Sequence, residues 1–123
     1  MLYWAAVFFV IALVGAVLGF SGIAAEKLQQ ALVTEYAPGA GIGWHRDKPM
    51  FADVVALSFL SPCVLRLRRR EGARWARHSV PIAPRSGYLL HGPAREEWEH
   101  SIAARDALRY SVTFRSFRPE YRG

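Results

Sequence analysis

The chain has 123 residues, enough for one small hydrophobic core, and a formal net charge of +6. Its single cysteine, Cys63, excludes an internal disulfide and is typical of a small buried strand residue in a reducing compartment. The positive charge favours anionic partners, such as nucleic acid, lipid headgroups or a dicarboxylate, although it also serves solubility alone.

The first segment is apolar, because no Asp, Glu, Lys or Arg precedes Glu26. Residues 2–25 are long enough to cross a hydrocarbon layer, which needs about 20 apolar residues. A cleaved signal peptide is disfavoured, since no basic region comes first and the apolar run is too long. We therefore predict a domain boundary near Ala25, with a transmembrane helix at 1–25 and a polar domain at 26–123. The alternative is a buried helix of a soluble protein.

The orientation of the predicted helix in the membrane follows from Lys27 and the Arg-rich remainder, because positively charged residues next to a span tend to stay on the cytoplasmic side. The first 24 or so residues also resemble the start of the small bacterial YtjA-like inner-membrane proteins, which implies membrane residence and nothing about chemistry. We expect an inner-membrane anchor with the catalytic domain in the cytoplasm. If the apolar segment is an artefact of the reading frame, the protein is cytoplasmic.

The remaining sequence predicts short strands separated by turns. Residues 25–32 are compatible with a short helix or linker, residues 37–41 with a turn, and Glu71 and Gly72 with a hairpin turn. The expected strands are 32–36, 53–60, 65–70, 74–80, 86–90, 100–102 and 109–114. Many short strands without a long amphipathic helix indicate an all-β sandwich or barrel, such as a jelly roll.

A metal site is predicted at His45, Asp47 and His100. His45 and Asp47 are two positions apart, so their side chains leave the same face of an extended segment, whereas Trp44 and Arg46 point away. His100 joins them only if a distant strand returns to the same place. Two imidazoles and one carboxylate suit Fe(II) with open positions better than structural zinc. The alternative is that the His-x-Asp spacing arises by chance and that the pair forms only a hydrogen bond at the surface.

A second candidate set lies on the last expected strand. Arg109 and Arg115 share a strand face with Ser111 and Thr113, which would be the interior of a small barrel. Buried arginine is costly unless it is paired, so we expect an anion there. An ideal strand separates the two arginines by about 20 Å, which makes Arg109 the stronger candidate. Two surface cations on an edge strand are the alternative.

The hairpin around Glu71 and Gly72 alternates arginines with apolar and aromatic residues. One of its faces is a candidate for following a phosphate backbone, and a solvated face that aids solubility is the alternative. The residues concerned are Arg66, Arg68, Arg69, Arg70, Arg74, Trp75 and Arg77. Candidates for a pocket mouth, with simple exposure as the alternative, are His78, Arg85, His91, Arg95 and Trp98.

Residues 28–118 resemble the AlkB family of Fe(II)/2-oxoglutarate dioxygenases. The motifs are Val-Thr-Glu-Tyr-Ala-Pro-Gly-Ala-Gly-Ile-Gly-Trp-His-Arg-Asp at 33–47, Glu-His-Ser-Ile at 99–102 and Arg-Tyr-Ser-Val-Thr-Phe-Arg at 109–115, in the family's order. The resemblance implies a jelly roll with a double-stranded β-helix core. Relatives carry a lid that grips a flipped-out base before the tyrosine motif. Here the apolar segment stands in that place, so the expected jelly roll is truncated on its N-terminal side.

The resemblance also implies residue roles. His45, Asp47 and His100 match the iron ligands, and Arg109 matches the arginine that pairs with the distal carboxylate of 2-oxoglutarate. Arg115 matches a second arginine near the chelating end. Two further residues match co-substrate contacts, namely Tyr36 and Thr34, the latter where well-known relatives carry Asn. Glu99 is interpreted as an exposed strand residue.

The implied activity is oxidative demethylation of alkylated DNA or RNA bases. It uses Fe(II), 2-oxoglutarate and O2, and it releases formaldehyde, succinate and CO2. The sequence indicates a membrane partner through residues 2–25 and no protein partner. The alternatives are a 2-oxoglutarate oxygenase that acts on a protein or small molecule, and a membrane-anchored inactive fragment.

Overall fold

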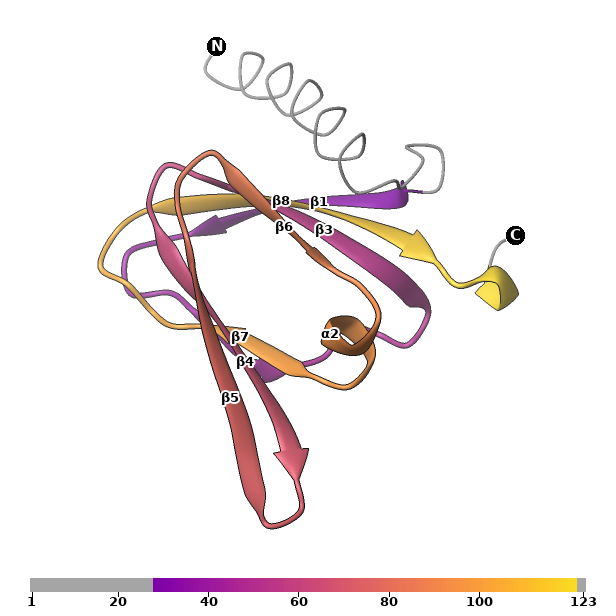
Figure 1. Ribbon diagram of the computed structural model, residues 1–123. Helices are drawn as coiled ribbons and strands as arrows, with labels where there is room; N and C mark the ends of the chain where they lie inside the picture. The colour runs from indigo at the N-terminus through magenta and orange to yellow at the C-terminus, as the bar shows by residue number, and fades with distance from the viewer. Residues whose placement is uncertain (1–27, 122–123) are drawn as a thin grey trace.

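The computed structural model describes residues 28–121 (Figure 1). The predicted helix at 1–25 and the predicted domain boundary lie outside the described residues. Within residues 28–121, no helix combines the length and the apolar character that a membrane span requires.

The described residues form two four-stranded antiparallel sheets that face each other (Figure 1). The first has the order β1 (Leu28–Tyr36), β8 (Arg109–Phe117), β3 (Phe51–Phe59), β6 (Ser86–Leu90). The second has the order β2 (Ile42–His45), β7 (Glu99–Ile102), β4 (Cys63–Glu71), β5 (Arg74–Ile82). A short helix, α2 (Pro93–Glu96), precedes β7, and a 3-10 turn (Pro119–Tyr121) follows β8. This mostly β arrangement is consistent with the jelly roll expected from the sequence.

The two sheets enclose one apolar core. Inward-facing positions of β4 alternate with outward-facing arginines, as the period of two in a strand requires. The buried cluster consists of Val54, Cys63, Leu65, Ile82, Leu90 and Ile102. Each buried aliphatic side chain of this kind contributes about 1.5 to 3 kcal/mol. Cys63 is only 2% exposed, so the prediction of a buried strand cysteine is confirmed.

Most predicted strands are present with longer bounds. The prediction for 86–90 matches β6, and the turn at Glu71 and Gly72 is confirmed, with Gly72 at a φ of 62°. The helix or linker predicted at 25–32 is wrong from Leu28 onward, because those residues pair with β8 as strand β1. Pairing with a distant strand outweighed a weak local preference. Strand β2 was not predicted, since its four residues include only two large apolar side chains.

Candidate metal centre

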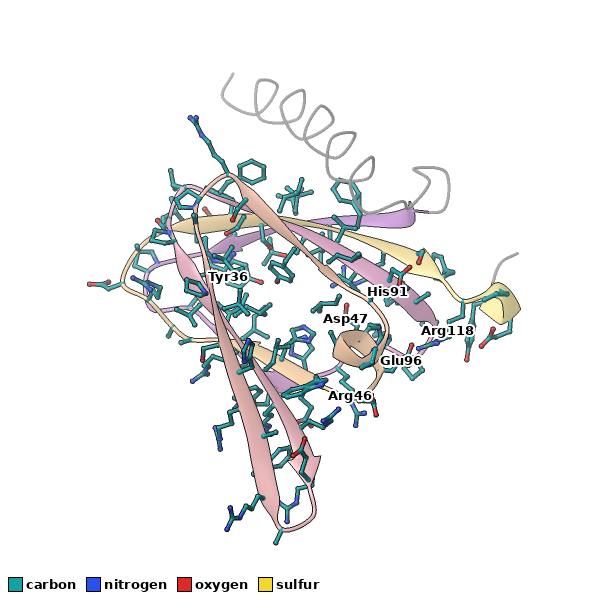
Figure 2. The ribbon with its side chains drawn as sticks, viewed as in Figure 1. Tyr36, Arg46, Asp47, His91, Glu96 and Arg118 are labelled. Atoms are coloured by element: carbon teal, nitrogen blue, oxygen red, sulfur yellow. The ribbon has the colours of Figure 1, made fainter. Side chains whose placement is uncertain are left out.

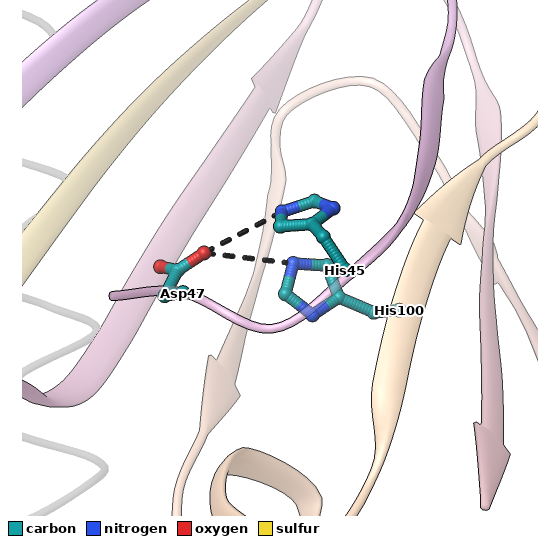
Figure 3. A group of neighbouring side chains, drawn as sticks. All are labelled: His45, Asp47 and His100. Atoms are coloured by element: carbon teal, nitrogen blue, oxygen red, sulfur yellow. Dashed lines mark ion pairs between the residues drawn. The ribbon is translucent and has the colours of Figure 1, made fainter. Parts of the chain in front are cut away.

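Two neighbouring strands bring the two histidines together. His45 on β2 lies directly opposite His100 on β7, and their ring centroids are 4.3 Å apart. Asp47 follows in the loop directly after β2. Its Oδ1 is 3.5 Å from His45 Nε2 and 3.9 Å from His100 Nε2 (Figure 3). One donor atom from each residue lies within 4.8 Å of the others, so the three converge as a metal site requires.

The histidine rings present lone pairs to this point. His45 Nδ1 lies 2.9 Å from the Gly43 carbonyl oxygen, which only accepts, so Nδ1 carries the proton and Nε2 is free to ligate. Burial and the neighbouring His45 lower the pKa of His100 to about 4, against the opposing charge of Asp47. His100 is therefore neutral near pH 7, as metal ligation requires.

Arg115 orients the third donor. Its Nε donates to Asp47 Oδ2 at 2.8 Å, which leaves Oδ1 directed at the histidines. Burial raises the pKa of the Asp47 carboxyl, but the hydrogen bond and charge of Arg115, with smaller help from the two imidazoles, hold it below its usual range. Asp47 is therefore a carboxylate near pH 7 and carries the negative charge that a divalent cation prefers.

Arg95 fixes the loop that carries Asp47, a role that the sequence did not reveal. It is 5% exposed, so the prediction of a residue at a pocket mouth or in solvent is wrong. Its Nη2 lies 3.4, 2.9 and 2.7 Å from the carbonyl oxygens of Asp47, Lys48 and Phe51. Because its partners are backbone carbonyls, no side-chain pattern announces the contact. The helix α2, which supplies Arg95, lies at one end of the space between the two sheets (Figure 1).

A cavity of about 210 Å³ adjoins the three donors between the sheets. It is smaller than the roughly 300 to 1,000 Å³ of sites for drug-sized ligands, and so suits a small molecule. Its wall includes six of the residues singled out from the sequence, namely Thr34, Tyr36, His45, Asp47, His100 and Arg115. Tyr88, whose segment predicts only a strand, also lines it, and burial raises the pKa of this phenol above its usual range. Tyr88 therefore stays a neutral hydroxyl.

Arg109 is not part of the cavity wall, but it is buried against Tyr36, which is, and it is incompletely paired among the described residues. It is 5% exposed, its guanidinium carbon lies 4.1 Å from the centroid of the Tyr36 ring, and its Nη1 donates to Ser58 Oγ at 3.1 Å. Its Nη2 is buried and has no hydrogen-bond partner within residues 28–121. An unpaired buried donor on a charged group is costly, so Arg109 is suited to an anion that enters beside Tyr36.

Two further candidates, His91 and Trp98, have partners outside the donor set. His91 pairs with Asp53 at 2.6 Å, and Trp98 lies under Arg69 at 4.8 Å. Glu99 is partly buried and pairs with Arg68 at 2.7 Å, so the prediction of an exposed strand residue is wrong. Figure 2 shows Asp47 near the centre of the molecule, whereas Glu96 and Arg118 lie at its edge.

The donor set fits Fe(II). Two imidazoles and one carboxylate form the three-ligand arrangement of non-haem iron oxygenases, which leaves coordination positions for co-substrate and O2. Structural zinc takes four protein ligands, and the described residues bring together three. The fold and the site thus define a small β-sandwich with an interior metal centre of the oxygenase type.

Comparison with known proteins gives the family. The model for the 2OG-Fe(II) oxygenase superfamily matches residues 6–115, and the chain belongs to this superfamily. The chain is similar to the "Alkylated DNA repair protein ALKBH8 homolog" of Arabidopsis thaliana, with 31% identity over 99 residues that cover 67% of this chain and 29% of that protein. It is also similar to an uncharacterized protein of Acanthamoeba polyphaga mimivirus, with 28% identity over 104 residues, 74% of this chain and 49% of that protein.

The family sets the cofactor and co-substrate as Fe(II) and 2-oxoglutarate, which agrees with the His-Asp-His donor set. The chain spans less than half the length of these two relatives. The family match begins at residue 6 and so overlaps the apolar segment, for which a membrane span stays a prediction.

Proposed function

We propose that this protein is an Fe(II)/2-oxoglutarate-dependent dioxygenase that demethylates N-alkylated nucleic-acid bases. The observation that carries the proposal is the convergence of His45, Asp47 and His100 on one cavity, with Arg109 buried against Tyr36 in the wall of that cavity. A metal site with open positions and an adjacent anion site are the two parts that such a reaction needs.

Each residue of the site has a role in this proposal. The two histidines and Asp47 hold the iron, and Arg109 pairs through its free Nη2 with the distal carboxylate of 2-oxoglutarate. Tyr36 and Thr34 line the cavity, and in this proposal their hydroxyls form further hydrogen bonds to the co-substrate. Arg115 lines the cavity while it orients Asp47, so it lies near the chelating end.

The bound iron supplies the oxidising power of the reaction. In the overall reaction an N-methyl group, 2-oxoglutarate and O2 yield the N–H base, formaldehyde, succinate and CO2. One oxygen atom enters succinate and the other enters formaldehyde, while 2-oxoglutarate loses its carboxyl carbon as CO2. The protein contributes orientation of the ligands, the anion site and an enclosed cavity, and no side chain need act as a general base.

The nucleic-acid substrate rests on two observations. The Arabidopsis relative carries the name of an alkylated DNA repair protein. The chain has a formal net charge of +6, which favours approach to a polyanion. A protein or small-molecule substrate and an inactive fragment are the outcomes against which the proposal is tested.

The test is formaldehyde release from single-stranded DNA and RNA oligonucleotides that carry N-methylated bases. The full chain is supplied with Fe(II), 2-oxoglutarate and air, and unmethylated oligonucleotides of the same sequence serve as controls. We expect formaldehyde and succinate in equal amounts, and neither from Asp47→Asn. Succinate without an oligonucleotide product would point to another substrate, and the absence of both would indicate an inactive fragment.

We also propose that residues 2–25 anchor the protein in the inner membrane with residues 26–123 in the cytoplasm. The proposal depends on the apolar, uncharged sequence of this segment alone. The full chain should remain in the membrane fraction after an alkaline carbonate wash and be released by detergent. Release by carbonate would contradict the anchor without affecting the catalytic proposal.

A further inference from the structure

The outer face of the second sheet carries interleaved arginines and tryptophans. On β4, Leu65 is in the core, so Arg66, Arg68 and Arg70 have the opposite, outward parity. The aromatic members are Trp44 of β2 and Trp75 of β5. We call the set Trp44, Arg66, Arg68, Arg70, Trp75 and Arg77 the Arg–Trp face. It runs along the β4–β5 hairpin, which projects beyond the rest of the sandwich (Figure 1), where Figure 2 shows nitrogen-tipped side chains on both strands.

The tryptophans hold the guanidinium groups in fixed positions. The Arg68 guanidinium carbon lies 4.4 Å from the centroid of the Trp44 ring and 4.3 Å from that of Trp75. Arg66 lies 5.2 Å from Trp44, and Arg70 lies 5.3 Å from Trp75. Guanidinium groups that are already stacked on rings lose less side-chain entropy when they bind a ligand. The face is therefore preorganised.

The hydrogen bonds of these arginines leave their outer nitrogens available. Nε of Arg66 donates to Ser101 Oγ at 3.0 Å, Nε of Arg68 to Glu99 Oε2 at 2.7 Å, and Nε of Arg70 to the Gly72 carbonyl at 2.9 Å. Among the described residues, none of the three has a hydrogen bond through Nη1 or Nη2. Each arginine thus uses Nε for its position in the fold and keeps a two-nitrogen fork, the geometry that suits phosphate oxygens.

The charge on this face is not balanced within the described part of the fold. Arg68 lies directly opposite Arg77 on β5, and like charges that face each other across strands are destabilising. On the other side, Arg68 faces Glu99 of β7, and this carboxylate neutralises one of the two arginine charges. A polyanion would relieve the repulsion that remains.

We propose that the Arg–Trp face binds the phosphate backbone of single-stranded nucleic acid, on the opposite side of the sheet from the metal cavity. Arg66, Arg68 and Arg70 repeat every two residues, about 6.8 Å along the strand, which is comparable to the spacing of successive phosphates in an extended single strand. The inference rests on the proposed function only in its choice of nucleic acid as the polyanion.

The test measures binding of unmethylated, fluorescently labelled single-stranded oligonucleotides to the metal-free full chain by anisotropy at several salt concentrations. Arg70→Gln/Arg77→Gln changes two exposed residues of the face. The control Arg85→Gln/Arg105→Gln removes the same charge from loops outside the face. We expect the first variant to bind several-fold more weakly, with a salt slope shallower by about 1.4, since each phosphate that is no longer neutralised lowers the slope by roughly 0.7. The control should match the parent protein.

A second pair of variants tests the positioning by Trp75. Trp75→Leu keeps all charges, so we expect weaker binding with an unchanged salt slope, and we expect Trp75→Phe to restore most of the affinity. Equal weakening by the charge variant and its control would overturn the proposal, because net charge alone would then explain binding. Binding of phosphatidylserine vesicles that depends on Arg70 and Arg77, without oligonucleotide binding, would also overturn it.

These binding outcomes are independent of the proposed chemistry. If the face binds oligonucleotides but no methylated base is oxidised, the demethylation proposal fails and the binding face stands. If methylated bases are oxidised but binding does not depend on the Arg–Trp face, the binding proposal fails and the demethylation proposal stands.

Discussion

Arg115 and Asp47 form an ion pair in which Nε and Oδ2 are 2.8 Å apart, and the other carboxylate oxygen, Oδ1, is the one that faces both histidines. The arginine thus divides the carboxylate into an oxygen held by the protein and an oxygen offered to a cation. This division explains how a loop residue, beyond the end of β2, presents a fixed metal donor.

The first prediction concerns this pair. Arg115→Gln should weaken Fe(II) binding by about 10- to 100-fold, the usual cost of losing a partner that orients a metal ligand. Arg115→Lys, which keeps the charge without the planar fork, should have an intermediate effect. Anaerobic titration with Fe(II) in the absence of 2-oxoglutarate measures the change directly. Arg105→Gln is the charge-matched control, and an equal loss in that variant would show that Arg115 acts only through net charge.

The second prediction concerns Arg95, whose Nη2 bonds three carbonyl oxygens around the Asp47 loop. Arg95→Met should lower the free energy of unfolding by about 3 kcal/mol, because hydrogen bonds from a buried charged group are worth about 1.5 to 3 kcal/mol each. It should also weaken Fe(II) binding, since Asp47 loses its fixed position. Denaturant unfolding and metal titration give the two values.

Arg69→Gln is the control for Arg95. It breaks exposed pairs with Glu71 and Glu97, outside the Asp47 loop, and should change the free energy of unfolding far less. Arg95→Met protein that is destabilised but binds Fe(II) with parental affinity would contradict a role for Arg95 in positioning the ligand.

The third prediction separates the co-substrate from the metal. Arg109→Gln should weaken 2-oxoglutarate binding by about 30-fold or more, which corresponds to a loss of roughly 2 kcal/mol for a buried charge pair. Fe(II) binding should not change, because Arg109 is no part of the donor set. Calorimetric titration with 2-oxoglutarate, in the presence of Mn²⁺ in place of iron, gives the affinity. Parental affinity in the variant would remove Arg109 from the co-substrate site.

The fourth prediction is acid lability of the metal-free protein. The pKa of His100 is about 4 in the folded protein and 6.5 when unperturbed, so between these values the unfolded chain binds more protons. The free energy of unfolding should therefore fall as the pH is lowered from 6.5 toward 4, by about 2 kcal/mol at pH 5 from this residue alone. Denaturant unfolding at pH 7.5 and pH 5 measures it. In His100→Gln most of this pH dependence should disappear, and an unchanged slope would assign the effect to other groups.

Much of the candidate site follows from strand geometry and is visible in the sequence. His45 and His100 are predicted as partners, and β2 and β7 place them opposite each other. Arg109 and Arg115 are expected on one inward face, and both are largely buried on β8. Alternation along a strand makes these assignments possible, since it fixes which residues share a face.

Other features could not be predicted from the sequence because they depend on contacts with the backbone or on distant pairing. Arg95 binds carbonyl groups of a loop that is 44 or more residues away in the chain, which no residue pattern records. Tyr88 lines the cavity because β6 pairs with β3, and its own segment predicts only a strand. The sequence assigns Arg115 to the co-substrate alone, because its pairing with Asp47 depends on the path of the loop after β2.

The most direct test of the central claim is anaerobic addition of Fe(II) and then 2-oxoglutarate to the full chain, followed by visible absorption. If the two histidines and Asp47 hold iron beside a co-substrate site, a weak charge-transfer band should appear only when both are present, and Asp47→Asn should not produce it. A parent protein that develops no band, and binds Fe(II) no more tightly than Asp47→Asn, would contradict the metal centre.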